Sequence, residues 1–96
     1  MRNINKKLID FFTNDKFKVL VVLNKHQIQV QEATFSPLTQ QEISEILHYS
    51  KAKINQIINE LIDNEFIEFY NNTKGRYVIT KKAIDILKIF NDEEIV

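Results

Sequence analysis

Hydrophobic residues in the first third of the chain recur mostly at helical spacing. Residues 3–12 carry apolar side chains about one helical turn apart, which predicts a helix. Residues 15–25 are apolar nearly all round, which fits a buried helix or a buried strand. A helix is favoured, because the segment is about eleven residues long and begins with residues that cap helices. Residues 27–31 alternate like a strand but also fit an extension of that helix, so we predict an irregular segment over 26–36.

Two helices separated by a very short turn are predicted between residues 39 and 64. Thr39 and Glu42 have the spacing of a capping box, in which each side chain bonds the backbone N–H of the other residue. Ser50 is a second candidate N-cap. Asn64 tolerates the left-handed conformation and is expected to end the second helix. The apolar positions of that helix follow at i, i+3, i+4, i+7 and i+8: Ile54, Ile57, Ile58, Leu61 and Ile62.

After residue 65 the hydrophobic period changes from helical to two. Two short β-rich runs over residues 66–80 flank a five-residue polar loop, 71–75, that holds the only glycine, which predicts a hairpin. Thr80 then caps a last helix over 81–94. We therefore predict a mainly α single domain over residues 1–96, in which a helix-turn-helix (39–64) is followed by a wing (66–80) and a C-terminal helix.

Composition narrows the class of protein. The chain has 96 residues and no Cys, which excludes a disulfide scaffold, a thiol nucleophile and a Cys-based zinc site. Two isolated His residues do not suggest a metal site, and we expect no cofactor. No glycine-rich phosphate loop, serine elbow or pair of catalytic carboxylates is present, so we do not expect an enzyme. With neither an export signal nor an apolar run of about 20 residues, we expect a cytoplasmic protein without membrane contact.

The positions of the charged residues change how the net charge of zero is interpreted. The 13 Lys and Arg residues balance the 13 Asp and Glu residues, which by itself argues weakly against nucleic-acid binding. The cations, however, gather at the start of the second helix and along the hairpin. Cations suit phosphates, and the carboxamides of Asn and Gln pair bidentately with adenine. The residues expected to contact DNA are Ser50, Lys51, Ala52, Lys53, Asn55, Gln56 and Asn59 on the helix, with Lys74, Gly75 and Arg76 in the wing.

Residues 38–90 resemble winged helix-turn-helix regulators of the MarR/ArsR type. The likeness rests on the start of the second helix (Ser50–Ile54), its end with the first wing strand (Leu61–Ile67), and the second strand running into the last helix (Ile79–Ala83). Glu65 and Ala83 depart from the family, which usually has Gly at both positions. The resemblance implies a DNA-binding regulator.

A narrower resemblance is to the small TubR-like adaptors of tubulin-type plasmid and phage partition systems. The matching residues are Tyr49-Ser50-Lys51 at the entry to the second helix, Gly75-Arg76 in the wing, Ile67-Glu68, and the apolar last helix over 84–90. This resemblance implies a centromere-binding dimer whose partner is a tubulin-like GTPase that forms filaments.

Apolar residues near both ends exceed what a small three-helix core can bury, and such a surplus marks an interface. We therefore expect a homodimer formed by the terminal helices, through Leu8, Phe11, Phe12, Ile86, Ile89 and Phe90. The predicted function is sequence-specific binding of double-stranded DNA, as a transcriptional regulator or a partition adaptor. The alternative is a winged-helix module that binds protein and not DNA, for which a neutral charge is natural.

Overall fold

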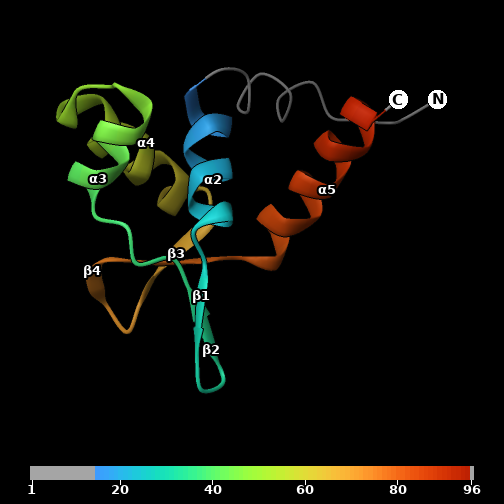
Figure 1. The fold of residues 1–96 in the computed structure, drawn as a ribbon, viewed down its shortest axis with the longest axis horizontal. Coiled ribbons are helices and arrows are strands. Elements are labelled where there is room, and N and C mark those ends of the chain that lie inside the picture. Colours follow the sequence, from blue (N-terminus) through green and yellow to red (C-terminus); the bar gives the residue numbers. More distant parts are fainter. Residues whose placement is uncertain (1–14, 96) are drawn as a thin grey trace.

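The computed structural model of the protein describes residues 15–95, apart from the side chains of Lys74 and of residues 90–95. Figure 1 shows α2 in the middle, α3 and α4 on one side of it, α5 on the other, and two hairpins below. The helix predicted over residues 3–12 lies outside the described residues. The elements are α2 (Asp15–Lys25), β1 (Ile28–Val30), β2 (Ala33–Phe35), α3 (Gln40–Leu47), α4 (Lys51–Asp63), β3 (Ile67–Tyr70), β4 (Thr73–Ile79) and α5 (Lys81–Ile95).

Helix α2 is the central element of the core, as its nearly uniform apolar character predicts. It is a helix and not a strand, and Val19, Leu20 and Leu23 are fully buried. The Ile ladder of α4 packs into the same cluster, where Ile54, Ile58 and Leu61 have no exposed surface. The core therefore fixes how α4 is rotated, and with it which side chains of α4 face outward.

Helices α3 and α4 begin at the caps that the sequence predicts. The Thr39 hydroxyl accepts from the Glu42 N–H at 3.1 Å, and the Glu42 carboxylate accepts from the Thr39 N–H at 2.8 Å, which confirms the capping box. Ser50 caps α4 by accepting from the Lys53 N–H at 3.0 Å. His48 ends α3 with a φ of +60°, and this single left-handed residue keeps the turn between the helices short.

Helix α4 ends at its C-cap Asn64, as predicted, but Asn64 is not left-handed. Asn64 has a φ of −93°, and the left-handed residue is Glu65, with a φ of +63°. The Glu65 N–H donates to the Ile62 carbonyl at 3.0 Å and the Phe66 N–H donates to the Leu61 carbonyl at 2.9 Å, which are the two bonds of a Schellman motif. The prediction that Asn64 takes the left-handed position was wrong, because burial of Phe66 against the core fixes the motif one residue later.

The hairpin of β3 and β4 has a shorter loop than the five residues predicted. Tyr70 pairs with Thr73, so Asn71 and Asn72 form a two-residue turn, with φ values of +51° and +56° that match a type I′ turn. The register then shifts, because Phe69 pairs with Tyr77. Residues 74–76 therefore form a bulge within β4 and are not part of the loop.

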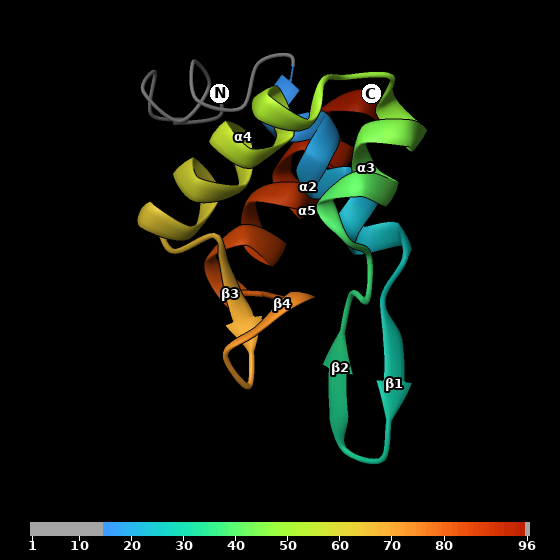
Figure 2. The same ribbon diagram turned by 90° about the vertical axis from the view of Figure 1, so that its left-hand side faces the viewer.

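Residues 28–35 form a hairpin where an irregular segment was expected, and it is called the first hairpin below, with that of β3 and β4 as the second. Ile28 pairs with Phe35 and Val30 with Ala33, around a turn at Gln31 and Glu32. The prediction was wrong because Gln31 takes a φ of +56°, a conformation that sequence patterns associate with Gly or Asn. Figure 2 shows this hairpin projecting beside that of β3 and β4.

Ser36 joins the two hairpins. Its N–H donates to the Tyr77 carbonyl at 2.8 Å, and the Tyr77 N–H donates to the Ser36 carbonyl at 2.9 Å. Helix α5 follows β4, and the Thr80 hydroxyl caps it by accepting from the Ala83 N–H at 3.3 Å, as predicted. No helix in the described part of the chain is both long enough and apolar enough to cross a membrane.

Candidate nucleic-acid interface

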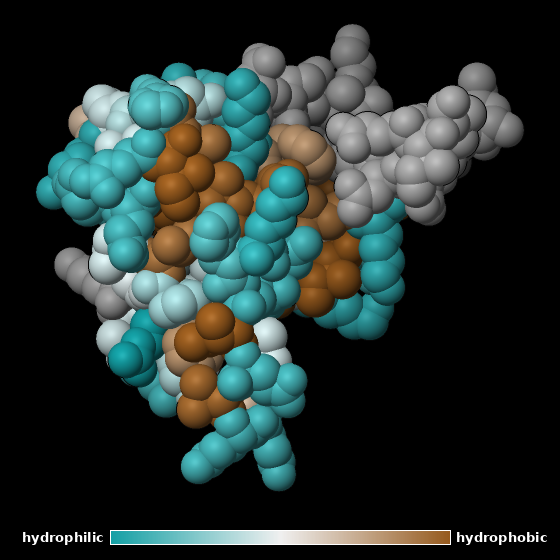
Figure 3. Space-filling view, in the orientation of Figure 1, coloured by the Kyte–Doolittle hydropathy of each residue, from teal (hydrophilic) through white to brown (hydrophobic). Residues whose placement is uncertain are grey.

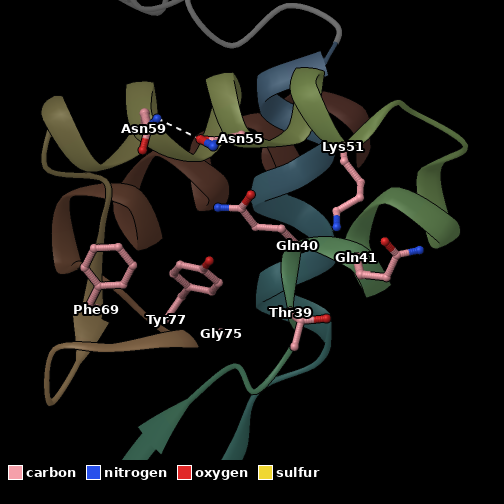
Figure 4. A pocket seen from close by; sticks show the side chains of 9 residues that line it. All are labelled: Thr39, Gln40, Gln41, Lys51, Asn55, Asn59, Phe69, Gly75 and Tyr77. Atoms are coloured by element: carbon pink, nitrogen blue, oxygen red, sulfur yellow. Dashed lines mark hydrogen bonds between the residues drawn. The ribbon is translucent and has the colours of Figure 1, made fainter.

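A groove of about 420 Å³ opens where α3, α4 and the hairpin of β3 and β4 meet. Figure 4 shows Gln40 between α4 and the hairpin, and Lys51 extending from α4 toward the start of α3. The groove combines carboxamides and one ammonium group with two aromatic rings. Its lining consists of Thr39, Gln40 and Gln41 from the start of α3, Lys51, Asn55 and Asn59 from α4, and Phe69, Gly75 and Tyr77 from β3 and β4.

The α4 side of the groove is one strip of the helix. Lys51, Asn55 and Asn59 are spaced i, i+4 and i+8, so they lie along one face, and all three are exposed. Asn59 Nδ2 donates to Asn55 Oδ1 at 2.9 Å, which aligns the two carboxamides. In the part of the chain that the structure describes, no acid pairs with Lys51. Its charge is therefore available to a ligand in the groove.

The bulge of β4 closes the other side of the groove. Gly75 has a φ of +84°, a conformation that favours glycine, and a Cβ at this position would be in ordinary van der Waals contact with Thr39 Cγ2 at 3.4 Å. The exposed Arg76 follows, with its guanidinium carbon 5.6 Å from the centre of the Phe35 ring. Phe35 in turn stacks on Tyr70 at 4.3 Å between ring centres. The first hairpin therefore supports the cation that the second hairpin presents.

Lys53 belongs to a different cluster, on the side of α4 that faces α2. Its Nζ lies 2.6 Å from an Asp15 carboxylate oxygen and 4.2 Å from the centre of the Tyr49 ring. The Tyr49 hydroxyl donates to Asp15 at 2.7 Å. These bonds from Lys53 and Tyr49 hold the pKa of Asp15 below its usual value, and the carboxylate raises the pKa of Tyr49. The cluster ties the start of α4 to the start of α2.

Residues 36–68 match a family model described as winged helix-turn-helix DNA-binding. The match begins at Ser36, directly after the first hairpin, and covers α3, α4 and the start of β3. The fold is a winged helix-turn-helix. A search of the curated proteins found no match.

In the winged helix-turn-helix, α4 is the recognition helix, and β3 with β4 is the wing. The groove brings Gly75 of the wing together with three residues of the outward face of α4: Lys51, Asn55 and Asn59. Lys53 does not point into the groove, because it pairs with Asp15. The remaining predicted residues fall outside the groove. Ser50 caps the helix, Ala52 and Gln56 are exposed on a neighbouring strip, Arg76 is exposed beside Phe35, and Lys74 lies in β4 with its side chain outside the described part.

The residues predicted to form a dimer interface divide into two groups. Leu8, Phe11 and Phe12, and the side chain of Phe90, lie outside the described part of the protein. Ile86 is only 8% exposed and belongs to the core, while Ile89 is half-buried. Ile86 is therefore used for the fold itself, and Ile89 is the one described residue of this set with surface left for a partner.

Sequence reasoning missed the α3 side of the groove. Gln40 and Gln41 were interpreted only as the interior of a capping box, and Phe69 and Tyr77 only as β-strand residues. The signal that was available is the position of Gln40 and Gln41 in the first turn of α3, directly after the capping Thr39. Residues next to a capping Thr in a helix-turn-helix are therefore candidates for ligand contact.

Proposed function

We propose that this winged helix-turn-helix binds double-stranded DNA in a sequence-specific manner, as a homodimer and without catalysis. The observation that carries the proposal is the groove, in which Lys51, Asn55 and Asn59 form one outward strip of the helix matched by the DNA-binding family model. Recognition helices of this class contact base edges through their N-terminal half. Asn55 lies in that half of α4, and Lys51, at the first position, would contact a phosphate beside it.

The proposed DNA contacts are of two kinds. Lys51 and Arg76 bind phosphates and supply affinity that depends on salt. Asn55 and Asn59 read base edges, since a carboxamide pairs bidentately with the N6 and N7 positions of adenine. To do so they give up the 2.9 Å bond that joins them in the free protein. Phosphate contacts thus position the protein, and the two Asn residues supply the sequence preference.

An anisotropy titration with labelled duplex tests DNA binding. At 50 mM salt we expect binding, with log Kd rising linearly with log salt concentration, and each of Lys51→Ala and Arg76→Ala should lower the slope by about one. Lys88→Ala is the matched control, because Lys88 is an exposed lysine of α5, across α2 from the recognition helix (Figure 1). An unchanged slope in both the Lys51 and the Arg76 variant would contradict the phosphate contacts. No binding at 50 mM salt would favour the protein-binding alternative.

We further propose that the bound site is an operator or a partition centromere. The resemblance to partition adaptors at Tyr49-Ser50-Lys51 and Gly75-Arg76 supports the second role, in which a tubulin-like GTPase filament is the partner. Co-sedimentation distinguishes the two roles. An adaptor bound to its DNA should pellet with filaments of a tubulin-like GTPase encoded beside it, whereas a regulator should stay in the supernatant and repress a reporter placed behind its operator.

A further inference from the structure

The first hairpin exposes an apolar strip that the rest of the fold leaves uncovered. Ile28 is 44% and Val30 is 51% exposed, and both lie in β1. Their cross-strand partners are Phe35 and Ala33, so the four side chains share one face of the hairpin. Phe35, at the base, is covered by Tyr70 and Arg76. Figure 3 shows apolar surface on the part of the molecule that projects below the helices.

Strand β1 is also an open edge. It pairs with β2 alone, so its other side has no strand beside it among the described residues. Next to a two-residue turn the first pair, here Val30 and Ala33, directs its backbone groups inward. By alternation, the N–H and C=O of Gln29 point to the open edge. The Gln31 carbonyl accepts from the exposed Gln29 side chain at 3.3 Å, a weak bond that a second strand can replace.

The charges around β1 do not protect this edge. Exposed edges are usually blocked by Lys, Pro or a bulge, but residues 27–31 read Gln-Ile-Gln-Val-Gln, with no charge and no Pro. The charged residues stand at the two ends, Lys25 before the strand and Glu32 after it, and both are exposed. Such a strand is self-complementary, because antiparallel copies place the basic end of one beside the acidic end of the other.

We propose that two copies of this chain join through β1, antiparallel across a two-fold axis at Gln29. In this register Ile28 lies opposite the second copy's Val30 on the same face, so the exposed apolar residues of both copies form one strip. Gln27 lies opposite the second copy's Gln31, and Lys25 approaches the second copy's Glu32. The result is a four-stranded antiparallel sheet built from two hairpins, a form of strand addition. It assigns the homodimer to the first hairpin and not to the terminal helices.

Disulfide trapping tests the register. The chain has no cysteine, so a single Gln29→Cys substitution places one thiol in each copy, next to the two-fold axis. Directly opposite residues in a hydrogen-bonded antiparallel pair have Cα atoms about 5.5 Å apart, within the range a disulfide spans. Thr34→Cys is the matched control, since Thr34 pairs with Gln29 within the hairpin and is also exposed, but lies on β2 and not on the β1 edge. Under mild oxidation we expect a covalent dimer from Gln29→Cys only.

Sedimentation equilibrium tests the interface itself. The wild type should be dimeric at micromolar concentration, and Val30→Lys should weaken dimerisation at least tenfold by placing a charge in the shared apolar strip. Ile46→Lys is the control, because Ile46 is an exposed apolar residue of similar accessibility, 43%, on α3. Unchanged far-ultraviolet circular dichroism of Val30→Lys shows that the fold is kept. Pairing through β1 would be refuted by a monomeric wild type, by equal trapping of both Cys variants, or by an undiminished Val30→Lys dimer.

Pairing through β1 does not require DNA, so the two proposals fail separately. A monomeric protein that binds duplex with the expected salt slope would refute pairing through β1 and leave DNA binding intact. A dimer that Gln29→Cys traps but that ignores duplex at 50 mM salt would refute DNA binding and leave the edge intact.

Discussion

The two hairpins of this protein have the same construction and different surroundings. Each has a two-residue turn, at Gln31-Glu32 in one and Asn71-Asn72 in the other. The wing is anchored along its length by β-strand residues that enter the core, such as Ile67 and Tyr77. The first hairpin is anchored only at its base, by Phe35. We infer that the wing serves to hold the groove, while the free end of the first hairpin remains available to a second copy.

The same contrast explains what the sequence reveals. The wing was predictable because its turn uses Asn-Asn and its neighbourhood holds the only Gly, residue types that adopt positive φ at low cost. The first hairpin was not, because Gln31 adopts positive φ without belonging to those types. Gln27 to Gln31 also alternate in a way that suits a helix end equally well.

The recognition helix also shows what the sequence can and cannot predict. The spacing of Ile54, Ile57 and Ile58 predicts correctly which face of α4 is buried. It does not predict which neighbour an outward side chain meets, and so Lys53 was grouped with Lys51 although it pairs with Asp15 on α2. Pairs that join distant parts of the chain are decided by tertiary packing, about which local periodicity carries no information.

Alanine substitutions at the base and at the tip of the first hairpin should differ most in their effect on the stability of the protein. Phe35→Ala removes a buried ring that stacks on Tyr70 and supports Arg76, so we expect a loss of about 3 kcal/mol in urea unfolding. Val30→Ala, beside the turn at the half-exposed tip, should cost less than about 1 kcal/mol in a monomer. Equal losses would mean that the hairpin is not anchored at its base.

The next largest effect on stability is expected at the bulge of the wing. Gly75→Ala places a side chain at a φ of +84°, which should cost about 1–2 kcal/mol of unfolding free energy. Gly75→Asn is the comparison, since Asn tolerates positive φ and should cost less. Chemical denaturation measures both, and a Gly75→Ala variant as stable as the wild type would contradict the left-handed conformation of the bulge.

Substitution by glycine should change the stability of the protein much more in the turn of the first hairpin than in the turn of the wing. Gln31→Gly relieves a left-handed residue and should stabilise the protein by about 1 kcal/mol, measured by chemical denaturation. Asn72→Gly should change stability by only a few tenths of a kcal/mol, because Asn already suits a type I′ turn. A larger gain at Asn72 than at Gln31 would reverse our explanation of why one hairpin was predictable.

The smallest effect concerns the cluster of Asp15, Tyr49 and Lys53, which anchors α4 to α2 and touches neither hairpin. The pKa of Asp15 is lowered in the folded state, so its stabilisation is present above the unfolded pKa of about 3.9 and is lost as pH falls through the lower folded value. Thermal unfolding should therefore show Asp15→Asn as less stable than the wild type at pH 7. The difference should shrink below about pH 4. A difference that does not depend on pH would place its origin elsewhere than in the ionised carboxylate.

The location of the DNA interface is tested most directly by two-dimensional amide NMR of the labelled protein during titration with duplex. We predict the largest shifts at the backbone amides of Gln40, Lys51 and Gly75 and at the side-chain NH₂ groups of Asn55 and Asn59, all of which line the groove. The amides of α5 should move little, since that helix lies on the other side of α2 (Figure 1). Shifts centred on α5, with the groove unchanged at saturating duplex, would contradict the account.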